Sequence, residues 1–128
     1  MKQTNRKGFT LAELLIVVAI IAVLVAIAIP VFTKQLHNAR AATDLANVRS
    51  YYAEIQADYM STGEYNNKVP DLNLSVGGYD YKTITLLNGE KIKILAGNCA
   101  VIFEEGKGYS ISYNCDSYHP EHELLLSN

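Results

Sequence analysis

Residues 7–15 read KGFTLAELL, and an apolar run follows them without a break as far as Phe32. The 19 residues from Leu14 to Phe32 carry no charged side chain, which is about the length that a helix needs to cross the hydrocarbon core of a bilayer. Glu13 lies at the start of this run. A carboxylate at membrane depth costs roughly 2.5–3.5 kcal/mol and is by default a functional residue that needs a partner. We therefore treat Glu13 as a candidate functional residue.

Four features of residues 1–32 occur together: Gly8, Phe9 directly after it, an acid (Glu13) as the fifth residue counted from Phe9, and Pro30 within the long apolar run. In this combination they resemble the leader and N-terminal helix of a type IV prepilin or pseudopilin. The resemblance implies that a prepilin peptidase cleaves between Gly8 and Phe9 and methylates the new Phe9 amine. It also implies that Glu13 of an incoming subunit pairs with the Phe9 amine of its neighbour in a filament.

The implied pairing has a physical basis. The amine freed at Phe9 would lie at a helix N-terminus, where unpaired N–H groups and the helix dipole favour negative charge and disfavour a cation. Glu13 can compensate this amine within its own helix, one turn on, or between subunits. Only the second arrangement makes assembly depend on the pair, because an unpaired charge is expensive in a low-dielectric setting.

Two other interpretations of the apolar run stay open. An ordinary secretory signal also has a basic region followed by an apolar one, and Ala26-Ile27-Ala28 offers an A-x-A cleavage site. Glu13 would then lie inside the apolar region, where an acid is not expected. A plain single-span anchor explains the length and the basic flank, but it does not explain the series from Gly8 to Glu13.

The charge distribution is asymmetric. The chain of 128 residues has 11 basic and 13 acidic residues, a net charge of −2. Cleavage after Gly8 would remove Lys2, Arg6 and Lys7 and leave 8 basic against 13 acidic residues, or −5 before the new amine is counted. The positive-inside rule then keeps the leader in the cytoplasm and sends the acidic remainder out. An acidic soluble part repels phosphate, so we expect no direct nucleic-acid binding.

Beyond Phe32, apolar and aromatic residues recur at spacings of three and four, as on one face of an amphipathic helix. We predict one helix from Phe9 to Thr62, ended by Gly63 and kinked at Pro30, which lacks a backbone N–H. The predicted packing face consists of Leu45, Val48, Tyr52, Ile55 and Tyr59. The charged residues predicted to be solvated are Lys34, Arg40, Asp44, Arg49, Glu54 and Asp58.

The second half of the chain has the pattern of two hairpins. After a loop at residues 63–78, Tyr79–Leu86 and Glu90–Leu95 flank Leu87-Asn88-Gly89, and a three-residue loop there pairs Ile84 with Ile92. In the second hairpin, a loop at Gly106-Lys107-Gly108 places Phe103 opposite Ile111, Val101 opposite Tyr113 and Cys99 opposite Cys115. This register gathers the apolar residues on one face.

The two cysteines are candidates for a disulfide cross-link that stabilises a small domain. Because the soluble part is predicted to be exported and the register brings Cys99 opposite Cys115, we predict a disulfide between them. Two free buried thiols are the alternative, since direct cross-strand geometry does not always suit the bond.

The tail holds a dense group of possible cation ligands: Asp116, His119, Glu121, His122 and Glu123. Such a group is able to bind a divalent cation weakly, but we interpret the histidines as solvent-exposed loop residues and predict no metal site and no cofactor. His37, just past the apolar run, is interpreted as a surface or interface residue. The leucines at 124–126 are expected to return to the sheet as an edge strand or a docked coil.

Together these patterns predict an α+β fold, in which a long N-terminal helix, half membrane-spanning and half amphipathic, packs on a small antiparallel sheet of about four strands. The expected divisions are a cleaved leader (1–8), an apolar helix for the membrane or filament core (9–32) and a globular head (33–128). The head comprises an amphipathic helix half (33–62), a loop (63–78), an antiparallel sheet (79–115) and a tail (116–128).

No catalytic motif is apparent, so we expect a structural protein and not an enzyme. The resemblance implies a pilus subunit that is held in the cytoplasmic membrane with its N-terminus inside and then polymerises into an extracellular filament. The implied partners are further copies of the chain, the prepilin peptidase, an assembly ATPase and a platform protein. The alternatives are a pseudopilin of a type II secretion or competence system and a secreted or membrane-anchored binding domain.

Overall fold

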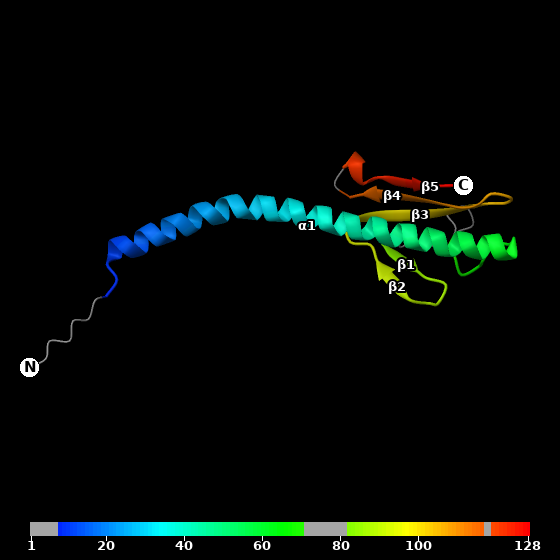
Figure 1. Ribbon diagram of the computed structural model, residues 1–128, viewed down its shortest axis with the longest axis horizontal. Helices are drawn as coiled ribbons and strands as arrows, with labels where there is room; N and C mark the ends of the chain where they lie inside the picture. The colour runs from blue at the N-terminus through cyan, green and yellow to red at the C-terminus, as the bar shows by residue number, and fades with distance from the viewer. Residues whose placement is uncertain (1–7, 71–81, 117–118) are drawn as a thin grey trace, which may run out of the picture. The chain divides into compact units, whose positions relative to one another are not determined.

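The computed structural model describes residues 8–70, 82–116 and 119–128 (Figure 1). One long helix, α1 (Leu11–Thr62), precedes five short strands. The strands are β1 (Thr83–Thr85), β2 (Lys91–Lys93), β3 (Gly97–Glu104), β4 (Gly108–Cys115) and β5 (Leu124–Leu126), with a 3-10 helix η1 (Pro120–His122) before the last. The predicted α+β class is confirmed. The strands form two antiparallel sheets, β1-β2 and β3-β4-β5.

The chain divides into two compact units, Met1–Leu36 and His37–Asn128, and α1 contributes to both. In the first unit, every described residue from Gly8 to Leu36 is exposed. The helix continues through Pro30 without a break in its assignment. It is the one candidate membrane span among the described residues, by length and apolar composition.

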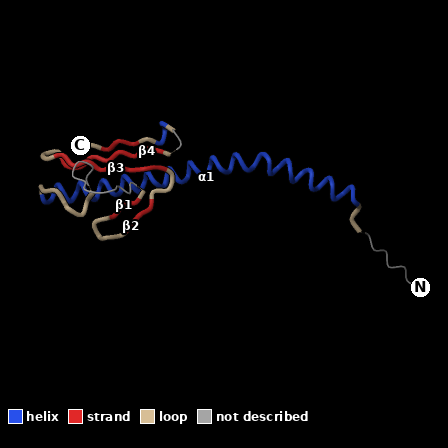
Figure 2. The backbone as a smooth tube through the Cα atoms, turned by 180° about the vertical axis from the view of Figure 1, so that it is seen from behind, coloured by secondary structure: helices blue, strands red, loops and turns tan. Residues whose placement is uncertain are grey.

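The second unit contains the core. Both views place the two sheets beside residues 37–62 of α1 (Figures 1 and 2). The residues that this part of the helix buries are Ala41, Asp44, Val48, Tyr51, Ile55 and Gln56. From the sheets and the connecting segments, the core receives Val69, Ile84, Ile94, Cys99, Val101, Tyr109, Ile111 and Tyr113. One helix face thus packs on the inner faces of both sheets.

The observed packing face of α1 is rotated from the predicted one. Val48 and Ile55 are fully buried as predicted, whereas Leu45, Tyr52 and Tyr59 are only partly buried and flank the face. Because Asp44 is fully buried, its prediction as a solvated residue is wrong. The apolar spacing identified the correct side of the helix. It did not show that the polar residues Asp44 and Gln56 belong to the buried face, so the predicted centre of that face was displaced.

The predicted end of the helix and the first hairpin are confirmed. Gly63 follows α1 with φ 72°, a conformation that glycine adopts without the steric cost of a Cβ. In the hairpin, Ile84 pairs with Ile92, and Gly89 has φ 90° in the three-residue loop. The strands are shorter than predicted. The part of the prediction that covers residues 71–81 lies outside the described residues.

The predicted register of the second hairpin is wrong by two residues. Phe103 pairs with Tyr109, Cys99 with Tyr113 and Gly97 with Cys115. A two-residue shift keeps every side chain on its predicted face, so the apolar pattern could not distinguish the two registers. The observed register makes Glu104 the partner of Gly108. At Gly108, a Cβ would lie 2.7 Å from side-chain atoms of the helix, so helix packing as well as the turn determines the pairing.

The C-terminal leucines return to the sheet as expected. Leu124–Leu126 form β5 and pair antiparallel with β4, with Leu126 opposite Ile111 and Leu124 opposite Tyr113. Leu124 and Leu126 pack against the core, while Leu125 is exposed.

Candidate functional site

The predicted processing site is accessible. Gly8, Phe9 and Thr10 precede the helix, all three are exposed, and the Phe9 side chain is 88% exposed. A peptidase needs an accessible backbone at the bond that it cleaves. The segment at Gly8 and Phe9 meets this requirement in the first unit.

Glu13 caps the start of its own helix. Its Oε2 accepts a hydrogen bond from the backbone N–H of Thr10 at 3.1 Å, and Thr10 Oγ1 accepts one from the backbone N–H of Glu13 at 3.2 Å. These reciprocal bonds form a capping box, which satisfies two N–H groups that a helix start otherwise leaves unpaired. Our sequence reasoning missed this role, although the T-x-x-E spacing from Thr10 to Glu13 is its signature.

The apolar part of α1 has no covering surface within its own unit. Large side chains over its whole length are about half exposed or more, for example Leu15 at 62%, Val17 at 51% and Ile27 at 62%. A monomeric soluble protein rarely exposes apolar surface of this extent. The segment therefore requires a lipid bilayer or other protein chains as its surroundings.

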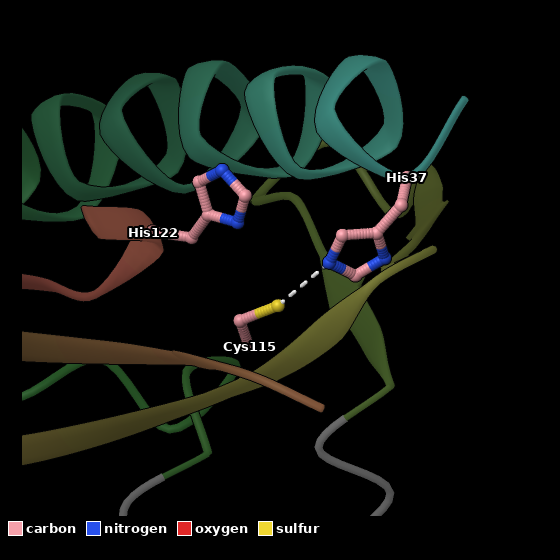
Figure 3. A group of neighbouring side chains, drawn as sticks. All are labelled: His37, Cys115 and His122. Atoms are coloured by element: carbon pink, nitrogen blue, oxygen red, sulfur yellow. Dashed lines mark hydrogen bonds between the residues drawn. The ribbon is translucent and has the colours of Figure 1, made fainter. Parts of the chain in front are cut away.

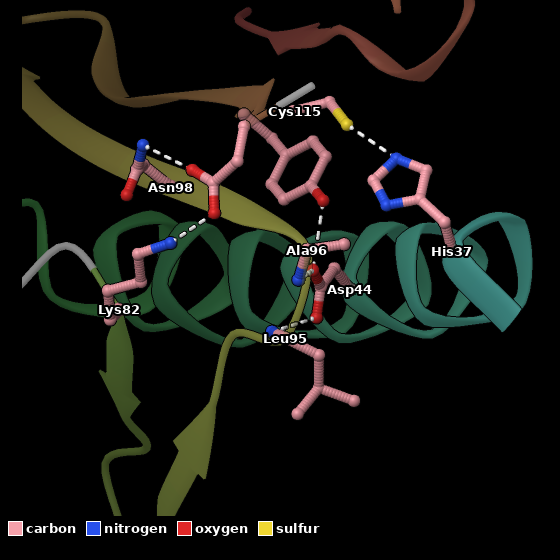
Figure 4. A network of polar contacts seen from close by, with 9 residues as sticks. His37, Asp44, Lys82, Leu95, Ala96, Asn98 and Cys115 are labelled. Atoms are coloured by element: carbon pink, nitrogen blue, oxygen red, sulfur yellow. Dashed lines mark hydrogen bonds and ion pairs between the residues drawn. The ribbon is translucent and has the colours of Figure 1, made fainter. Parts of the chain in front are cut away.

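In the second unit, Asp44 joins the helix to the connection between β2 and β3 and to β4 (Figure 4). Its carboxylate accepts hydrogen bonds from the backbone N–H groups of Leu95 at 2.8 Å and Ala96 at 2.7 Å, and from Tyr113 Oη at 2.9 Å. Leu95 and Ala96 connect β2 to β3, and Tyr113 lies in β4. Burial, together with the hydrogen bond to Asp44, raises the pKa of Tyr113 above its ordinary value.

Gln56 makes a second polar connection, at the turn between β3 and β4. Its Oε1 accepts a hydrogen bond from the backbone N–H of Tyr109 at 2.9 Å, and its Nε2 donates to the carbonyl of Lys107 at 3.4 Å. At Gly108, where φ is +94°, a Cβ would be strained and would lie 2.7 Å from side-chain atoms of Gln56 and Tyr59, so any other residue would have to displace them. Asp44 and Gln56 thus fix the sheet at two points along α1.

The two cysteines are free, so the predicted disulfide is not formed. The cause is the register: Cys99 lies opposite Tyr113, and Cys115 lies opposite Gly97. Cys99 is buried in the core, and burial, with a contribution from Asp44, raises the pKa of its thiol to about 11. Cys115 is partly buried, and its Sγ lies 3.1 Å from His37 Nε2 (Figure 3).

The charged residues of the tail do not gather at one point. Asp116 pairs with Lys82 and accepts a hydrogen bond from Asn98 Nδ2 at 3.1 Å (Figure 4). Glu121 is exposed and lies 3.3 Å from His119 Nδ1. His122 is instead partly buried, near His37 and Cys115 (Figure 3). The interpretation of His122 as a solvent-exposed loop residue is therefore wrong, and His37 is more than a surface residue.

Comparison with known proteins agrees with this arrangement. A family model described as the prokaryotic N-terminal methylation motif matches residues 3–29. The ComG operon protein 3 homolog of Bacillus licheniformis is 34% identical over 94 residues, which cover 73% of this chain and 94% of the relative. The chain belongs to the type IV pilin and pseudopilin family.

Two further members of this family are similar over smaller shares of their length. The type IV major pilin protein PilA of Myxococcus xanthus is 31% identical over 98 residues, 76% of this chain and 41% of the relative. The type IV narrow pilus major component PilA5 of Thermus thermophilus is 54% identical over 50 residues, 37% of this chain and 43% of the relative. No solved structure matches the chain.

Proposed function

We propose that this chain is a structural subunit of a type IV pilus. Prepilin peptidase cleaves it between Gly8 and Phe9 and methylates the Phe9 amine, and α1 then polymerises into the core of an extracellular filament. The observation that carries the proposal is the apolar part of α1, which is exposed throughout in its own unit and begins with a single carboxylate. The methylation motif at residues 3–29 supports the processing step.

Before assembly, the apolar part of α1 spans the cytoplasmic membrane with the basic leader inside. After assembly, the same residues pack against the helices of neighbouring copies. An assembly ATPase and a platform protein would move the subunit from one setting to the other. The role is structural and not enzymatic, so adhesion, twitching motility or DNA uptake would be properties of the whole fibre.

Glu13 contributes the charge that sets the position of a new subunit. Cleavage after Gly8 creates a cationic amine one residue before Thr10, whose N–H already donates to the Glu13 carboxylate. In a low-dielectric filament core, the positive charge of a neighbour's Phe9 amine would be compensated where it meets Glu13. The charge of an amine that meets no carboxylate would stay unpaired. Pairing therefore selects the axial position at which Glu13 meets the neighbour's Phe9.

A pseudopilin of a competence or type II secretion system is the second candidate. The observation in its favour is the similarity to the ComG operon protein 3 homolog, which spans 94% of that relative. The N-terminal processing and helix packing are the same in both proposals. They differ in the fibre, which is long and extracellular in the first and short and confined to the cell envelope in the second.

N-terminal sequencing of the mature protein tests the processing step. Methylated Phe9 is the expected first residue. A chain that starts at Ile29 would indicate ordinary secretion, and an uncut Met1 would indicate a plain anchor. Electron microscopy of sheared surface material then separates the two family functions, because only the pilus gives long filaments that contain this chain.

Two substitutions of Glu13 separate its charge from its capping role. Glu13→Gln retains a side chain that can accept the Thr10 N–H bond but removes the charge, and Glu13→Ala removes both. If the charge is what matters, both variants are excluded from filaments when they are co-expressed with the unmutated chain. Glu64→Ala, at an exposed acid beyond α1, is the control and should be incorporated normally. Normal incorporation of Glu13→Gln would contradict the pairing.

A further inference from the structure

Three side chains with metal-binding atoms meet in the second unit, although they are far apart in the sequence. His37 comes from α1, Cys115 ends β4, and His122 ends η1 (Figure 3). One ligand atom from each of the three lies within 4.8 Å of the others, and each residue is partly buried. The fold, and not a local motif, therefore brings them together.

The separations are close to those of a metal site. Tetrahedral zinc binds sulfur at about 2.3 Å and nitrogen at about 2.0–2.1 Å, which places neighbouring ligand atoms about 3.3–3.6 Å apart. His37 Nε2 and Cys115 Sγ are 3.1 Å apart. All three ligand atoms lie within 4.8 Å of one another, so the widest pair has to close by about 1.5 Å at most for tetrahedral coordination.

His122 supplies a second, independent observation. Its Nδ1 is buried and has no hydrogen-bond partner among the residues that the structure describes. A buried polar atom without a partner costs about 1–3 kcal/mol. A metal ion at the centre of the three side chains would satisfy this nitrogen.

A fourth imidazole lies beside the cluster. The ring centroid of His119 is 5.3 Å from that of His37 and 5.4 Å from that of His122. Its Nδ1 lies 3.3 Å from the Glu121 carboxylate, and its ligand atoms are not among the three that lie within 4.8 Å of one another.

We propose that His37, Cys115 and His122 form a binding site for a thiophilic divalent ion, with zinc as the natural occupant and the fourth position left to solvent or to a rotated His119. A thiolate with imidazoles selects zinc over calcium or magnesium, which prefer oxygen ligands. The ligand set does not include the acidic side chains of the tail. A bound ion would link the start of the packed half of α1 to the ends of β4 and η1. The ion would be a stabilising cross-link, which a disulfide between Cys99 and Cys115 cannot provide in this register.

Cobalt substitution tests the site directly. The full chain, purified in detergent and kept reduced, is stripped with a chelator and titrated with Co²⁺. Binding of about one ion per chain should produce the sulfur-to-metal charge-transfer band of a tetrahedral thiolate site, and Zn²⁺ should remove the band. Cys115→Ser should abolish it, and His37→Gln or His122→Gln should weaken binding at least about tenfold.

Cys99→Ser is the matched control, because it removes the other thiol and should leave the band unchanged. Loss of the band in Cys99→Ser, its persistence in Cys115→Ser, or no Co²⁺ binding by the reduced chain would overturn the proposal. X-ray absorption of the Zn²⁺-loaded, unmutated chain provides a test that no folding defect can confuse. One sulfur with nitrogen neighbours supports the site, and a shell of oxygen alone or of two sulfurs refutes it.

Discussion

The two halves of α1 belong to one helix but have opposite surroundings. Between residues 11 and 36 every side chain is exposed, whereas the half from residue 37 to Thr62 buries one face against both sheets. Val17 is 51% exposed and Val48 is 0% exposed, although both are valines in the same helix. Apolar character alone therefore does not place a residue in a core. In the first half, the covering partner has to come from outside the subunit.

The carboxylates of the two halves show the same contrast. Glu13 is exposed and bonds only locally, to Thr10 three residues away. Asp44 is fully buried and bonds to residues 51, 52 and 69 positions away. The exposed Glu13 carboxylate is therefore accessible to a new hydrogen-bond or ionic partner, whereas the Asp44 carboxylate is held by three hydrogen-bond donors.

The largest effect is expected for Asp44→Ala. The substitution leaves two backbone N–H groups and a tyrosine hydroxyl buried without an acceptor, so it should lower the free energy of unfolding of the second unit by about 3–5 kcal/mol. Denaturant titration of the full chain in detergent measures the change. Arg49→Ala, at an exposed position on the same half of the helix, should stay within about 0.5 kcal/mol. Equal effects of the two would show that the contacts of Asp44 do not stabilise the fold.

Gly97→Ala should have the next largest effect. The added Cβ would lie 2.3 Å from the carbonyl oxygen of Asn114 and 2.6 Å from the ring of Tyr113, and such overpacking costs about 1–3 kcal/mol. Gly106→Ala is the comparison, because φ +84° strains an alanine while nothing lies within 4 Å of its Cβ. The same denaturant titration should rank Gly97→Ala as more destabilising. The reverse order would contradict the observed β3–β4 register.

A pair of identical substitutions tests the two halves directly. Val48→Ala removes two buried methyl groups and should cost about 2 kcal/mol of unfolding free energy, whereas Val17→Ala should leave the stability of the second unit unchanged. In filaments Val17→Ala should also lower the melting temperature, because Val17 would then contribute to packing between subunits. Thermal melts of the isolated chain and of sheared filaments measure the two effects. A lower melting temperature of the isolated Val17→Ala chain would contradict the view that only the second half of α1 packs within the subunit.

The smallest effect is expected from alkaline pH. The pKa of Cys99 is raised by burial to about 11, so the folded state keeps a proton that the unfolded state releases above about pH 9. Stability of the second unit should therefore fall between about pH 9 and 11. Burial also raises the pKa of Tyr51 and of Tyr113, which extends the loss to higher pH.

The apolar run from Leu14 to Phe32 contains no titratable side chain, so its helix should persist. Circular dichroism in detergent would then show a partial loss of signal as the pH rises. Cys99→Ala should move the onset to higher pH. A complete loss of helix in one step would show that the two halves of α1 unfold together.

The sequence predicted those features of this fold that depend on local patterns. Helical spacing and Gly63 gave the end of α1, and the apolar alternation of the two strands, with Gly89 in the loop, gave the register of the first hairpin. The acid at Glu13 stood out because the apolar residues around it made a charge unexpected. Each of these signals lies within a few residues of the feature that it predicts.

The features that were missed depend on contacts between distant segments. The burial of Asp44 requires the N–H groups of Leu95 and Ala96 to arrive from the other half of the chain. The register of β3 and β4 depends on the helix side chain of Gln56 at the turn, and periodicity along either strand does not contain that information. The meeting of His37 with Cys115 has the same origin.

The capping box at Glu13 bears on whether assembly can be reversed. Because the carboxylate already accepts the Thr10 N–H bond before any neighbour arrives, the proposed pairing would exchange one partner for another. The net free energy of an exchange is the difference between two polar interactions, each of which contributes about 0.5–3 kcal/mol. For a subunit that carries Glu13, this charge would then favour neither addition nor removal strongly, whereas a subunit without it would leave the neighbour's amine unpaired. The direction of the reaction would be set by apolar packing and by the mechanical work done on the fibre.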